Sequence, residues 1–489
     1  MGADNARMDM DAQACYRAIS TRDARFDGRF FTGVKTTGIY CRSVCPARTP
    51  HSHNVVFFPT AAAAQEAGFR PCLRCRPETA PDLGAWRGTS NSVSRALNLI
   101  ELGALDEDDV DTLAGRLGLG ERQLRRLFRQ HLGASPVAVA QTRRILLAKQ
   151  LIHETRLPMA EIAFASGFGS VRRFNETFLA LFGRPPSELR RVSGPDCPAG
   201  PQGEIVLLLR YHPPYDWAAM LEFLRRRAIA GVESVGADCY ARAVELNGVH
   251  GTVAVQRGAG NALRATVRFP KLSALPTIIA RLRRVFDLAA DPVAITAHLA
   301  KDPALAPLVK ARPGLRVAGA WDGFELAIRA VLGQQITVAA AATLAARLVA
   351  SHGQRLAIGD AELTHVFPSP ATLASADLTS LGMPRSRAAA LSAVGAAAVA
   401  DPHLFDANCG LEDAVKRLRS IRGVGEWTAQ YIALRQLREP DAFPAADIGL
   451  LRAIAGREQR RPSSSELLDR ANAWRPWRAY AAQHLWASA

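Results

Sequence analysis

The stretch Leu418-Arg-Ser-Ile-Arg-Gly-Val-Gly-Glu-Trp-Thr-Ala-Gln-Tyr431 places two glycines, Gly423 and Gly425, between two runs of helix-forming residues. Glycine tolerates the backbone angles of a tight turn, so the pair predicts that one helix ends here and another begins. Because neither glycine carries a Cβ, backbone N–H groups at the turn can approach a phosphate, and the amino end of the second helix favours an anion. We therefore expect a helix, a hairpin and a helix that hold a nucleic-acid backbone without reading its sequence.

Asp447 follows this hairpin, 20 residues after Trp427, and precedes the apolar run that starts at Ile448. An Asp before an apolar run is typical of a helix N-cap. The residues alone therefore predict a cap, and any further function of this carboxylate depends on the rest of the chain.

Length and charge limit the class of protein. The chain has 489 residues, with 61 Lys plus Arg against 45 Asp plus Glu and a net charge of +16. At roughly 100 to 200 residues per domain, this length predicts about three or four domains. Such a charge without a basic tail indicates surfaces that bind a polyanion, with nucleic acid as the first candidate and a solvated basic surface as the alternative.

No segment directs the chain to a membrane or out of the cell. Met1–Met10 lacks the basic start and apolar core of a signal peptide, and the apolar stretch Ala327–Ala350 contains Arg329 and Arg347. We therefore expect a cytoplasmic protein with no membrane partner. Its eight cysteines should stay reduced there, so a tight cysteine cluster indicates a metal site or chemistry rather than disulfides.

Changes of pattern predict four domains and a linker. They are a cysteine-bearing domain (1–81), a helical domain (86–192), a Pro- and Gly-rich linker (193–203), an α+β domain (204–290) and a second all-helical domain (291–489). In the α+β domain we expect strands at 204–211, 237–246 and 263–269 and a helix at 217–230. The predicted fold class is multidomain, mainly α with α+β parts.

Four cysteines form two close pairs. Cys41 and Cys45 enclose three residues, Cys72 and Cys75 enclose two, and 26 residues separate the pairs. Two such pairs can converge on one tetrahedral Zn²⁺ with Zn–S distances of about 2.3 Å. The site can be purely structural. The alternative is a reactive site, because four thiolates around Zn²⁺ leave a net charge of roughly −2 and metal-bound thiolates remain nucleophilic.

The residues around these cysteines resemble a known family. Lys35–Cys45 (KTTGIYCRSVC) and Gly68–Cys75 (GFRPCLRC) are similar to the amino-terminal zinc domain of the Ada adaptive-response proteins. The resemblance implies that Cys41 irreversibly accepts a methyl group from a DNA methylphosphotriester while the other three cysteines hold zinc. One negative charge fewer beside DNA phosphates would then strengthen DNA binding. His51 and His53 are rival ligands, but four cysteines already complete the coordination.

The helical domain repeats one arrangement. Helices expected at 109–117 and 121–131 have helix-turn-helix spacing, and those expected at 158–166 and 170–182 have it again. A longer helix at 136–153 would join the two units, which suits two successive major-groove entries.

The stretch Ile162–Leu189 resembles the signature of AraC-type regulators, which implies a double helix-turn-helix. The candidate DNA contacts are Arg122, Gln123, Arg125, Arg126, Arg172, Arg173 and Asn175. Phosphate contacts give affinity without sequence preference, so which of these side chains read bases stays open.

From Arg210 to Ala489 the chain resembles the alkylbase glycosylase AlkA of the helix-hairpin-helix superfamily. Matching stretches are Pro213–Trp217, Val232–Val235, Tyr240–Arg242, Ala311–Arg316, Leu381–Pro384 and Trp474–Tyr480. The resemblance implies that Asp447 is the anion beside the sugar cation that develops once the nucleotide is extruded. An N-alkylated purine is itself a cation, so it leaves readily and stacks on aromatic rings.

The same resemblance supplies a base pocket made of Trp427, Tyr431, Trp486 and Phe223, although Phe223 could equally belong to the core. Superfamily members that also cut the strand have a Lys where Trp427 stands, so we expect a glycosylase without lyase activity. Only Cys409 lies beyond Cys239, so no iron–sulfur cluster is expected.

Three positions depart from the AlkA pattern. Gln335 stands where AlkA has an apolar wedge that fills the gap left by the flipped base, and Ile448 and Gly449 replace a Tyr and a Leu of the pocket. A polar side chain can still fill the gap left by the flipped base, but the range of damaged bases that the enzyme would release is left open.

We therefore predict a methyl-sensing transcriptional activator fused to a monofunctional glycosylase that hydrolyses the N-glycosidic bond of alkylated bases such as 3-methyladenine. The expected cofactor is one zinc ion. The expected partners are duplex DNA, both damaged and promoter DNA, and RNA polymerase. We expect the protein to bind them as a monomer. One alternative is a DNA-binding regulator whose glycosylase-like half is a non-catalytic docking platform. Another is a structural zinc that accepts no methyl group.

Overall fold

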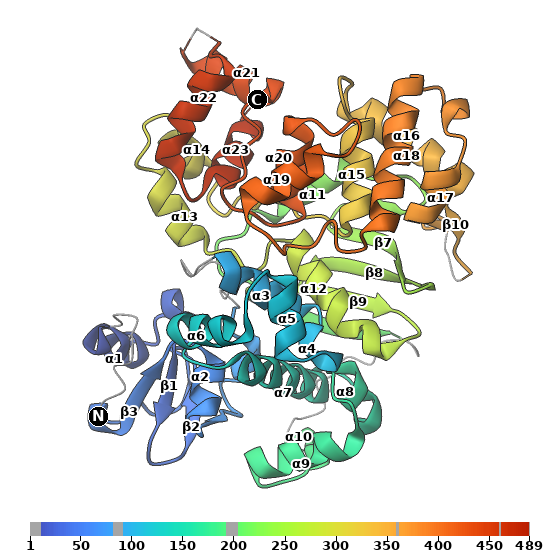
Figure 1. Ribbon diagram of the computed structural model, residues 1–489. Coiled ribbons are helices and arrows are strands. Elements are labelled where there is room, and N and C mark those ends of the chain that lie inside the picture. Colours follow the sequence, from blue (N-terminus) through green and yellow to red (C-terminus); the bar gives the residue numbers. More distant parts are fainter. Residues whose placement is uncertain (1–10, 82–90, 192–203, 358–360, 459–460, 489) are drawn as a thin grey trace. The chain divides into compact units, whose positions relative to one another are not determined.

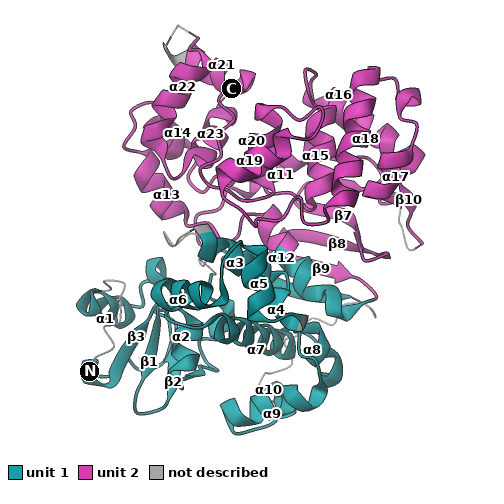
Figure 2. Ribbon diagram, viewed as in Figure 1, with its two compact units in different colours: residues 1–211, 271–280 teal, residues 212–270, 281–489 magenta. Residues whose placement is uncertain are grey.

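The computed structural model describes residues 11–81, 91–191, 204–357, 361–458 and 461–488. It forms two compact units, which Figure 2 distinguishes by colour: residues 1–211 with 271–280, and residues 212–270 with 281–489. The predicted linker at 193–203 lies outside the described residues. No described helix is both long and apolar enough to cross a membrane.

A small mixed sheet carries the cysteines, although the sequence analysis predicted no strands in this region. The elements are α1 (Ala12–Ser20), η1 (Ala24–Phe26), β1 (Phe31–Val34), β2 (Ile39–Cys41), η2 (Ser52–Asn54), β3 (Val55–Phe58), α2 (Ala61–Glu66), β4 (Arg70–Pro71) and η3 (Pro77–Thr79). The strand order is β3-β1-β2-β4, and only β2 and β4 pair in parallel. Because β2 ends at Cys41 and Cys72 directly follows β4, this pairing brings both cysteine pairs to one end of the sheet.

The helical domain contains both expected helix-turn-helix units (Figure 1). Its helices are α3 (Asn91–Glu101), α4 (Ala104–Glu107), α5 (Val110–Arg116), α6 (Glu121–Leu132), α7 (Pro136–Glu154), α8 (Met159–Ala165), α9 (Val171–Phe182) and α10 (Pro186–Arg191). The units are α5–α6 and α8–α9, and α7 joins them. The second helices bury the same positions, Leu124, Phe128 and Leu132 in α6 and Phe174, Phe178 and Phe182 in α9. Equal spacing of large apolar residues therefore makes the two units structural repeats.

The α+β part contains more strands than the sequence analysis predicted. Its elements are β5 (Ile205–Arg210), α11 (Trp217–Arg225), β6 (Glu233–Val235), β7 (Cys239–Leu246), β8 (Val249–Arg257), β9 (Ala262–Arg268), η5 (Leu272–Ala274) and α12 (Leu275–Val285). In the second unit the strands lie in the order β9-β8-β7-β6, and each pair of neighbouring strands is antiparallel. Missing β8 and β6 was an error, since Val253 and Val255 alternate in β8 as in any half-buried strand. The helix predicted to reach residue 230 ends at Arg225.

The remaining helices form the second all-α domain, apart from one short unpredicted pair of strands. The elements are α13 (Pro292–Leu299), α14 (Ala306–Ala311), α15 (Gly323–Leu332), α16 (Val338–His352), β10 (Gln354–Arg355), β11 (His365–Val366), α17 (Pro370–Ser375), η6 (Thr379–Leu381), α18 (Arg385–Ala400), α19 (Leu411–Arg419), α20 (Glu426–Arg435), α21 (Ile448–Glu458), α22 (Ser464–Ala471), η7 (Asn472–Trp474) and α23 (Arg478–Trp486). The centre of this domain is α15, which is buried except at Arg329 and packs on α16, α18 and α20. The predicted Gly-x-Gly turn joins α19 to α20, and α21 begins directly after Asp447.

Candidate functional site

The four cysteines form one cluster. Their Sγ atoms all lie within 4.8 Å of one another; Cys72 and Cys75 are buried, whereas Cys41 and Cys45 are partly exposed. Tetrahedral zinc with Zn–S bonds of about 2.3 Å places its sulfurs about 3.8 Å apart, so the cluster fits this ion. His51 and His53 are not in the cluster; their rings stack on each other, with centroids 5.6 Å apart.

A backbone amide ties the two cysteine pairs together. The N–H of Arg42 donates to Cys75 Sγ at 3.4 Å. Because Arg42 directly follows Cys41, this bond links the segment of the first cysteine pair to a sulfur of the second.

A cavity of about 340 Å³ opens beside Cys41. Five arginines contribute to its wall: Arg42, Arg48, Arg70, Arg74 and Arg184. A basic wall around a partly exposed thiolate suits a phosphate-bearing ligand.

Asp447 is both a helix cap and a cavity residue. Its Oδ1 accepts the N–H of Leu450 at 3.0 Å, which is the predicted capping bond. The indole N–H groups of Trp427 and Trp486 donate to Oδ2 at 2.7 Å and to Oδ1 at 2.9 Å. These three donors fix the orientation of the carboxylate.

The substitution at Gly449 makes room for this arrangement. A Cβ at that position would lie 3.0 Å from Asp447 Oδ1 and 3.3 Å from Trp486 Cδ1. Both contacts are closer than packing normally allows, so glycine lets the carboxylate and the indole approach the start of α21.

The predicted pocket residues line one cavity of about 1460 Å³ in the second unit, together with Asp447, Gly425 and Gln335. Trp427 and Tyr431 stack with ring centroids 5.2 Å apart, and Trp486 meets Tyr431 edge-on at 6.4 Å. All four aromatic side chains are partly exposed. Phe223, left open between core and pocket, lines the cavity as well.

Two arginines in this cavity escaped the sequence analysis. The guanidinium of Arg227 lies 3.9 Å from the Phe223 ring centroid, and that of Arg435 lies 4.3 Å from it and 4.9 Å from that of Tyr431. Burial by itself would raise the pKa of Tyr431, but the two guanidiniums lower it below its usual value. Each arginine follows its aromatic partner by four residues, a spacing that could have revealed them.

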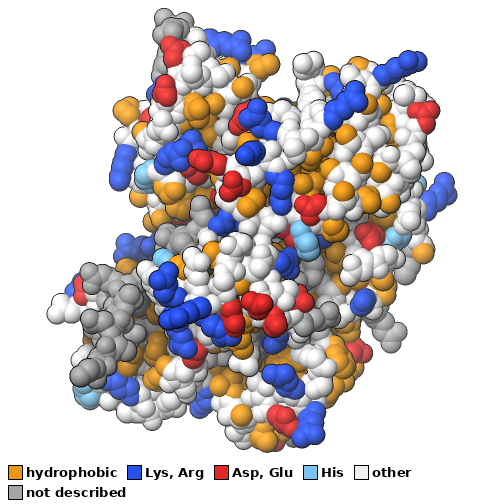
Figure 3. Space-filling view, in the orientation of Figure 1, with side chains coloured by type: hydrophobic (Ala, Val, Ile, Leu, Met, Phe, Trp, Pro, Cys, Tyr) orange, Lys and Arg blue, Asp and Glu red, His pale blue; other side chains and the backbone are white. Residues whose placement is uncertain are grey.

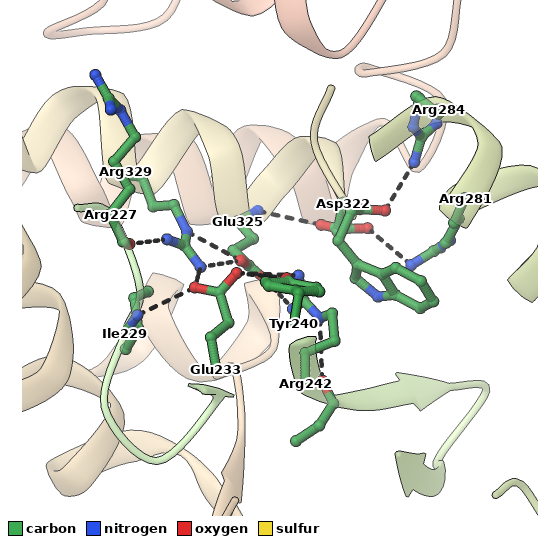
Figure 4. Close-up of polar contacts among 12 residues, drawn as sticks. Arg227, Ile229, Glu233, Tyr240, Arg242, Arg281, Arg284, Asp322, Glu325 and Arg329 are labelled. Carbon is green, nitrogen blue, oxygen red and sulfur yellow. Dashed lines mark hydrogen bonds and ion pairs between the residues drawn. The ribbon is translucent and has the colours of Figure 1, made fainter. Parts of the chain in front are cut away.

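A buried ionic network holds the chain segment that carries Arg227 (Figure 4). Arg329 donates to the carbonyl of Arg227 at 2.8 Å and to Glu325 at 2.9 Å. Glu325 also accepts from Arg242 at 2.7 Å. Burial would raise the pKa of Glu325, yet the two guanidiniums keep it well below its usual range. The network links α15, the sheet and the cavity wall.

The loop that carries Gln335 is tied to the hairpin. Gln334 Nε2 donates to the carbonyl of Gly423 at 2.9 Å and to Thr428 Oγ1 at 3.0 Å, while Arg387 donates to the Gln334 carbonyl at 2.6 Å. Gln335 is exposed and has a φ of +59°, a conformation that few non-glycine residues adopt. The predicted wedge and the predicted phosphate contact are therefore connected directly.

The candidate DNA contacts of the helix-turn-helix units are all exposed: Arg122, Gln123, Arg125, Arg126, Arg172, Arg173 and Asn175. Arg125 pairs with Glu121 at 2.5 Å and Arg172 pairs with Glu176 at 2.8 Å. On the face shown in Figure 3, basic side chains gather over α6.

Four family models match successive parts of the chain. They are described as the metal binding domain of Ada (residues 14–78), a helix-turn-helix domain (113–192), the AlkA N-terminal domain (206–322) and an HhH-GPD superfamily base excision DNA repair protein (328–478). The predicted resemblances, the predicted fold class and the single zinc site are thus confirmed.

Known relatives match the whole chain or its second half. A Mycobacterium tuberculosis protein named "Probable bifunctional transcriptional activator/DNA repair enzyme AlkA" is 41% identical over 479 residues, 97% of this chain and 96% of that protein. The Escherichia coli DNA-3-methyladenine glycosylase 2 is 36% identical over 57% of this chain and 95% of its own length. The fold of a 3-methyladenine DNA glycosylase from Archaeoglobus fulgidus covers 57% of this chain and 96% of that one, with a TM-score of 0.51 and 21% identity. The chain therefore belongs to the family of bifunctional transcriptional activator/DNA repair enzymes that join an Ada metal-binding domain to an AlkA glycosylase.

Proposed function

We propose that the second unit is a monofunctional DNA glycosylase that releases alkylated bases such as 3-methyladenine by hydrolysis. One observation carries this proposal: the carboxylate of Asp447 is held by two indole N–H groups in an aromatic cavity that the hairpin adjoins. A docking platform without catalysis would need neither an oriented carboxylate nor partly exposed stacked rings.

The reaction uses the charge of the damaged base. After extrusion, the cationic base stacks on Trp427 and Tyr431, and Gln335 fills the gap in the duplex. The glycosidic bond breaks with its electron pair leaving on the base, which becomes neutral. Asp447 stabilises the positive charge that develops on the sugar and orients the water that adds to C1′, and the proton lost by this water passes to solvent. With an indole rather than an amine at Trp427, no Schiff base forms and the strand stays intact.

Asp447→Asn tests this assignment. The amide keeps the shape of the side chain but removes the charge, so release of 3-methyladenine from alkylated duplex should fall at least about a hundredfold, the usual loss for a group that stabilises transition-state charge. Circular dichroism should show an unchanged fold. Turnover near that of the wild type would exclude Asp447 as the catalytic anion, whereas a wild-type chain that releases no base would favour the docking platform.

We propose that the first unit senses alkylation through Cys41. The thiolate attacks the methyl carbon of a methylphosphotriester; the S–C bond forms, the C–O bond breaks, and the electron pair stays on the phosphate oxygen. Cys41, Cys45, Cys72 and Cys75 would hold zinc, which would keep their sulfurs deprotonated at neutral pH. The partial exposure of Cys41 in a cavity with five arginines in its wall supports this sulfur as the acceptor.

Cys41→Ser tests the sensor. Mass spectrometry after exposure to methylphosphotriester DNA should find one added methyl group on the wild-type chain and none on the variant. Transfer that survives the substitution would assign the acceptor elsewhere, and no transfer to the wild type would leave a structural zinc.

We also propose that the protein binds promoter DNA as a monomer and contacts RNA polymerase there as an activator. Two helix-turn-helix units in one chain supply two groove entries, so no second copy is needed for binding.

A further inference from the structure

Lys149 on α7 is a fully buried cation that neither proposed activity uses. Its side chain has 0% exposure, and its Nζ donates to the carbonyl of Cys72 at 2.9 Å and pairs with Glu78 at 2.6 Å. The Glu78 side chain is 1% exposed. Lysine is almost never fully buried unless it is paired, because removing its charge from water is costly. Here the pairing joins the DNA-binding domain to the loop that carries a zinc ligand.

A second buried connection runs from α7 to the other zinc-ligand strand. Thr142 Oγ1 donates to Gln65 Oε1 at 3.1 Å, and Gln65 Nε2 donates to the hydroxyl of Tyr40 at 3.0 Å. Tyr40 is fully buried and precedes Cys41 in β2. Helix α7 is therefore connected to the segments of both cysteine pairs, directly at Cys72 and through Gln65 at Tyr40, and it also joins the two helix-turn-helix units.

We propose that Lys149 responds to the charge of the zinc–thiolate site, so that a change in this charge alters the packing of α7 on the zinc domain. The proposal rests on the proposed methyl transfer to Cys41, which would change the charge of the site from roughly −2 to −1. An ammonium held beside the site loses attraction when one negative charge disappears. Methylation then loosens the packing of α7 on the zinc domain, so the signal reaches the helix-turn-helix units through the protein as well as through DNA.

Distances set the size of the effect. Nζ lies 2.9 Å from the Cys72 carbonyl and the four sulfurs lie within 4.8 Å of one another, so every thiolate is within about 12 Å of the ammonium. With an effective dielectric constant of about 20, one unit charge at that distance changes an equilibrium constant of the ammonium alone roughly tenfold. The Glu78 carboxylate, 2.6 Å from the ammonium, responds with the opposite sign and offsets part of this effect.

Hydrogen exchange of the full-length, zinc-loaded protein tests the proposal. After exposure to methylphosphotriester DNA, removal of the DNA and confirmation of methylated Cys41 by mass spectrometry, exchange of the protected α7 amides should rise severalfold. In Lys149→Met, methylation should no longer raise α7 exchange, because only the Glu78 carboxylate remains beside the site. Lys149→Arg retains the charge and should retain the response. Arg129→Gln is the matched control and should also retain the response, because it removes only an exposed ion pair to Glu66 between the same two domains.

Unchanged α7 exchange in the methylated wild type would overturn the proposal, and so would an equal rise in Lys149→Met. Cys41→His separates this failure from failure of the proposed function, because a neutral imidazole can bind zinc and gives a site charge of roughly −1 without methyl transfer. With zinc content verified, α7 exchange in Cys41→His should exceed that of the wild type. The comparison of Cys41→His with the wild type also tests the proposal if Lys149→Met does not fold. Equal α7 exchange in these two proteins would contradict the proposal.

Discussion

Single residues in the glycosylase cavity combine structural and chemical functions. The carboxylate of Asp447 begins α21 by accepting the N–H of Leu450, and it also accepts from two indoles. The capping bond fixes the position of the carboxylate relative to the start of α21, and the two indoles fix the rotation of the carboxylate plane. A catalytic anion that must face a cation within a few tenths of an ångström benefits from both constraints.

Gly449→Ala separates stability from catalysis at this site. A Cβ would lie 3.0 Å from Asp447 Oδ1 and would displace the carboxylate by a few tenths of an ångström. Alanine in place of glycine otherwise stabilises a helix by about 0.5–1 kcal/mol. We expect an unchanged or raised melting temperature and base release reduced about tenfold. Wild-type base release in Gly449→Ala would show that the close contact has no catalytic consequence.

At the scale of elements, hydrogen bonds join the hairpin between α19 and α20 to the loop between α15 and α16. Gln334 donates to both Gly423 and Thr428, and Arg387 holds its carbonyl. If the hairpin binds a phosphate and Gln335 is the wedge, as proposed, these bonds fix the position of the wedge relative to that phosphate.

Gln334→Met should weaken base extrusion more than general DNA binding. The side chain keeps its length but loses two hydrogen bonds, which are worth about 1 kcal/mol each, so base release should fall about tenfold or more. The fluorescence of a base analogue beside the lesion should report less extrusion, with affinity for undamaged duplex nearly unchanged. Gln354→Met, which loses an exposed hydrogen bond to His250, is the matched control. Equal losses of extrusion and of general affinity would argue against this coupling.

At the scale of the whole molecule, the two proposed activities occupy different compact units. The cysteine cluster and the helix-turn-helix units lie in the first, and every residue that lines the large cavity lies in the second. Each unit has its own core, so loss of one site need not disturb the other.

Zinc removal checks this independence. Binding of zinc by a small domain contributes directly to its folding free energy, so chelation should abolish promoter binding and expose the first 81 residues to proteases. Base release by the same sample should stay within about twofold, because no cavity residue belongs to the first unit. A parallel loss of base release would show that the units are coupled.

Much of this organisation could be predicted because its signals are local. Two cysteine pairs, two helix-turn-helix spacings and a Gly-x-Gly turn are short patterns whose chemistry depends on neighbours in sequence. The strands of the zinc domain and β8 were missed because short strands gain stability from partners across a sheet rather than from their own residues.

The fold class, the metal ligands and the position of Asp447 could be inferred from the residues alone, since each follows from residue types at short, regular spacings. The surroundings of these residues became visible only in the folded chain. The indoles on Asp447, the Arg435 guanidinium on Phe223, the bonds from Gln334 to the hairpin and the buried Lys149 join residues that are distant in sequence or belong to different domains. Burial and charge at such sites depend on which chain segments pack together, and no local pattern records that packing.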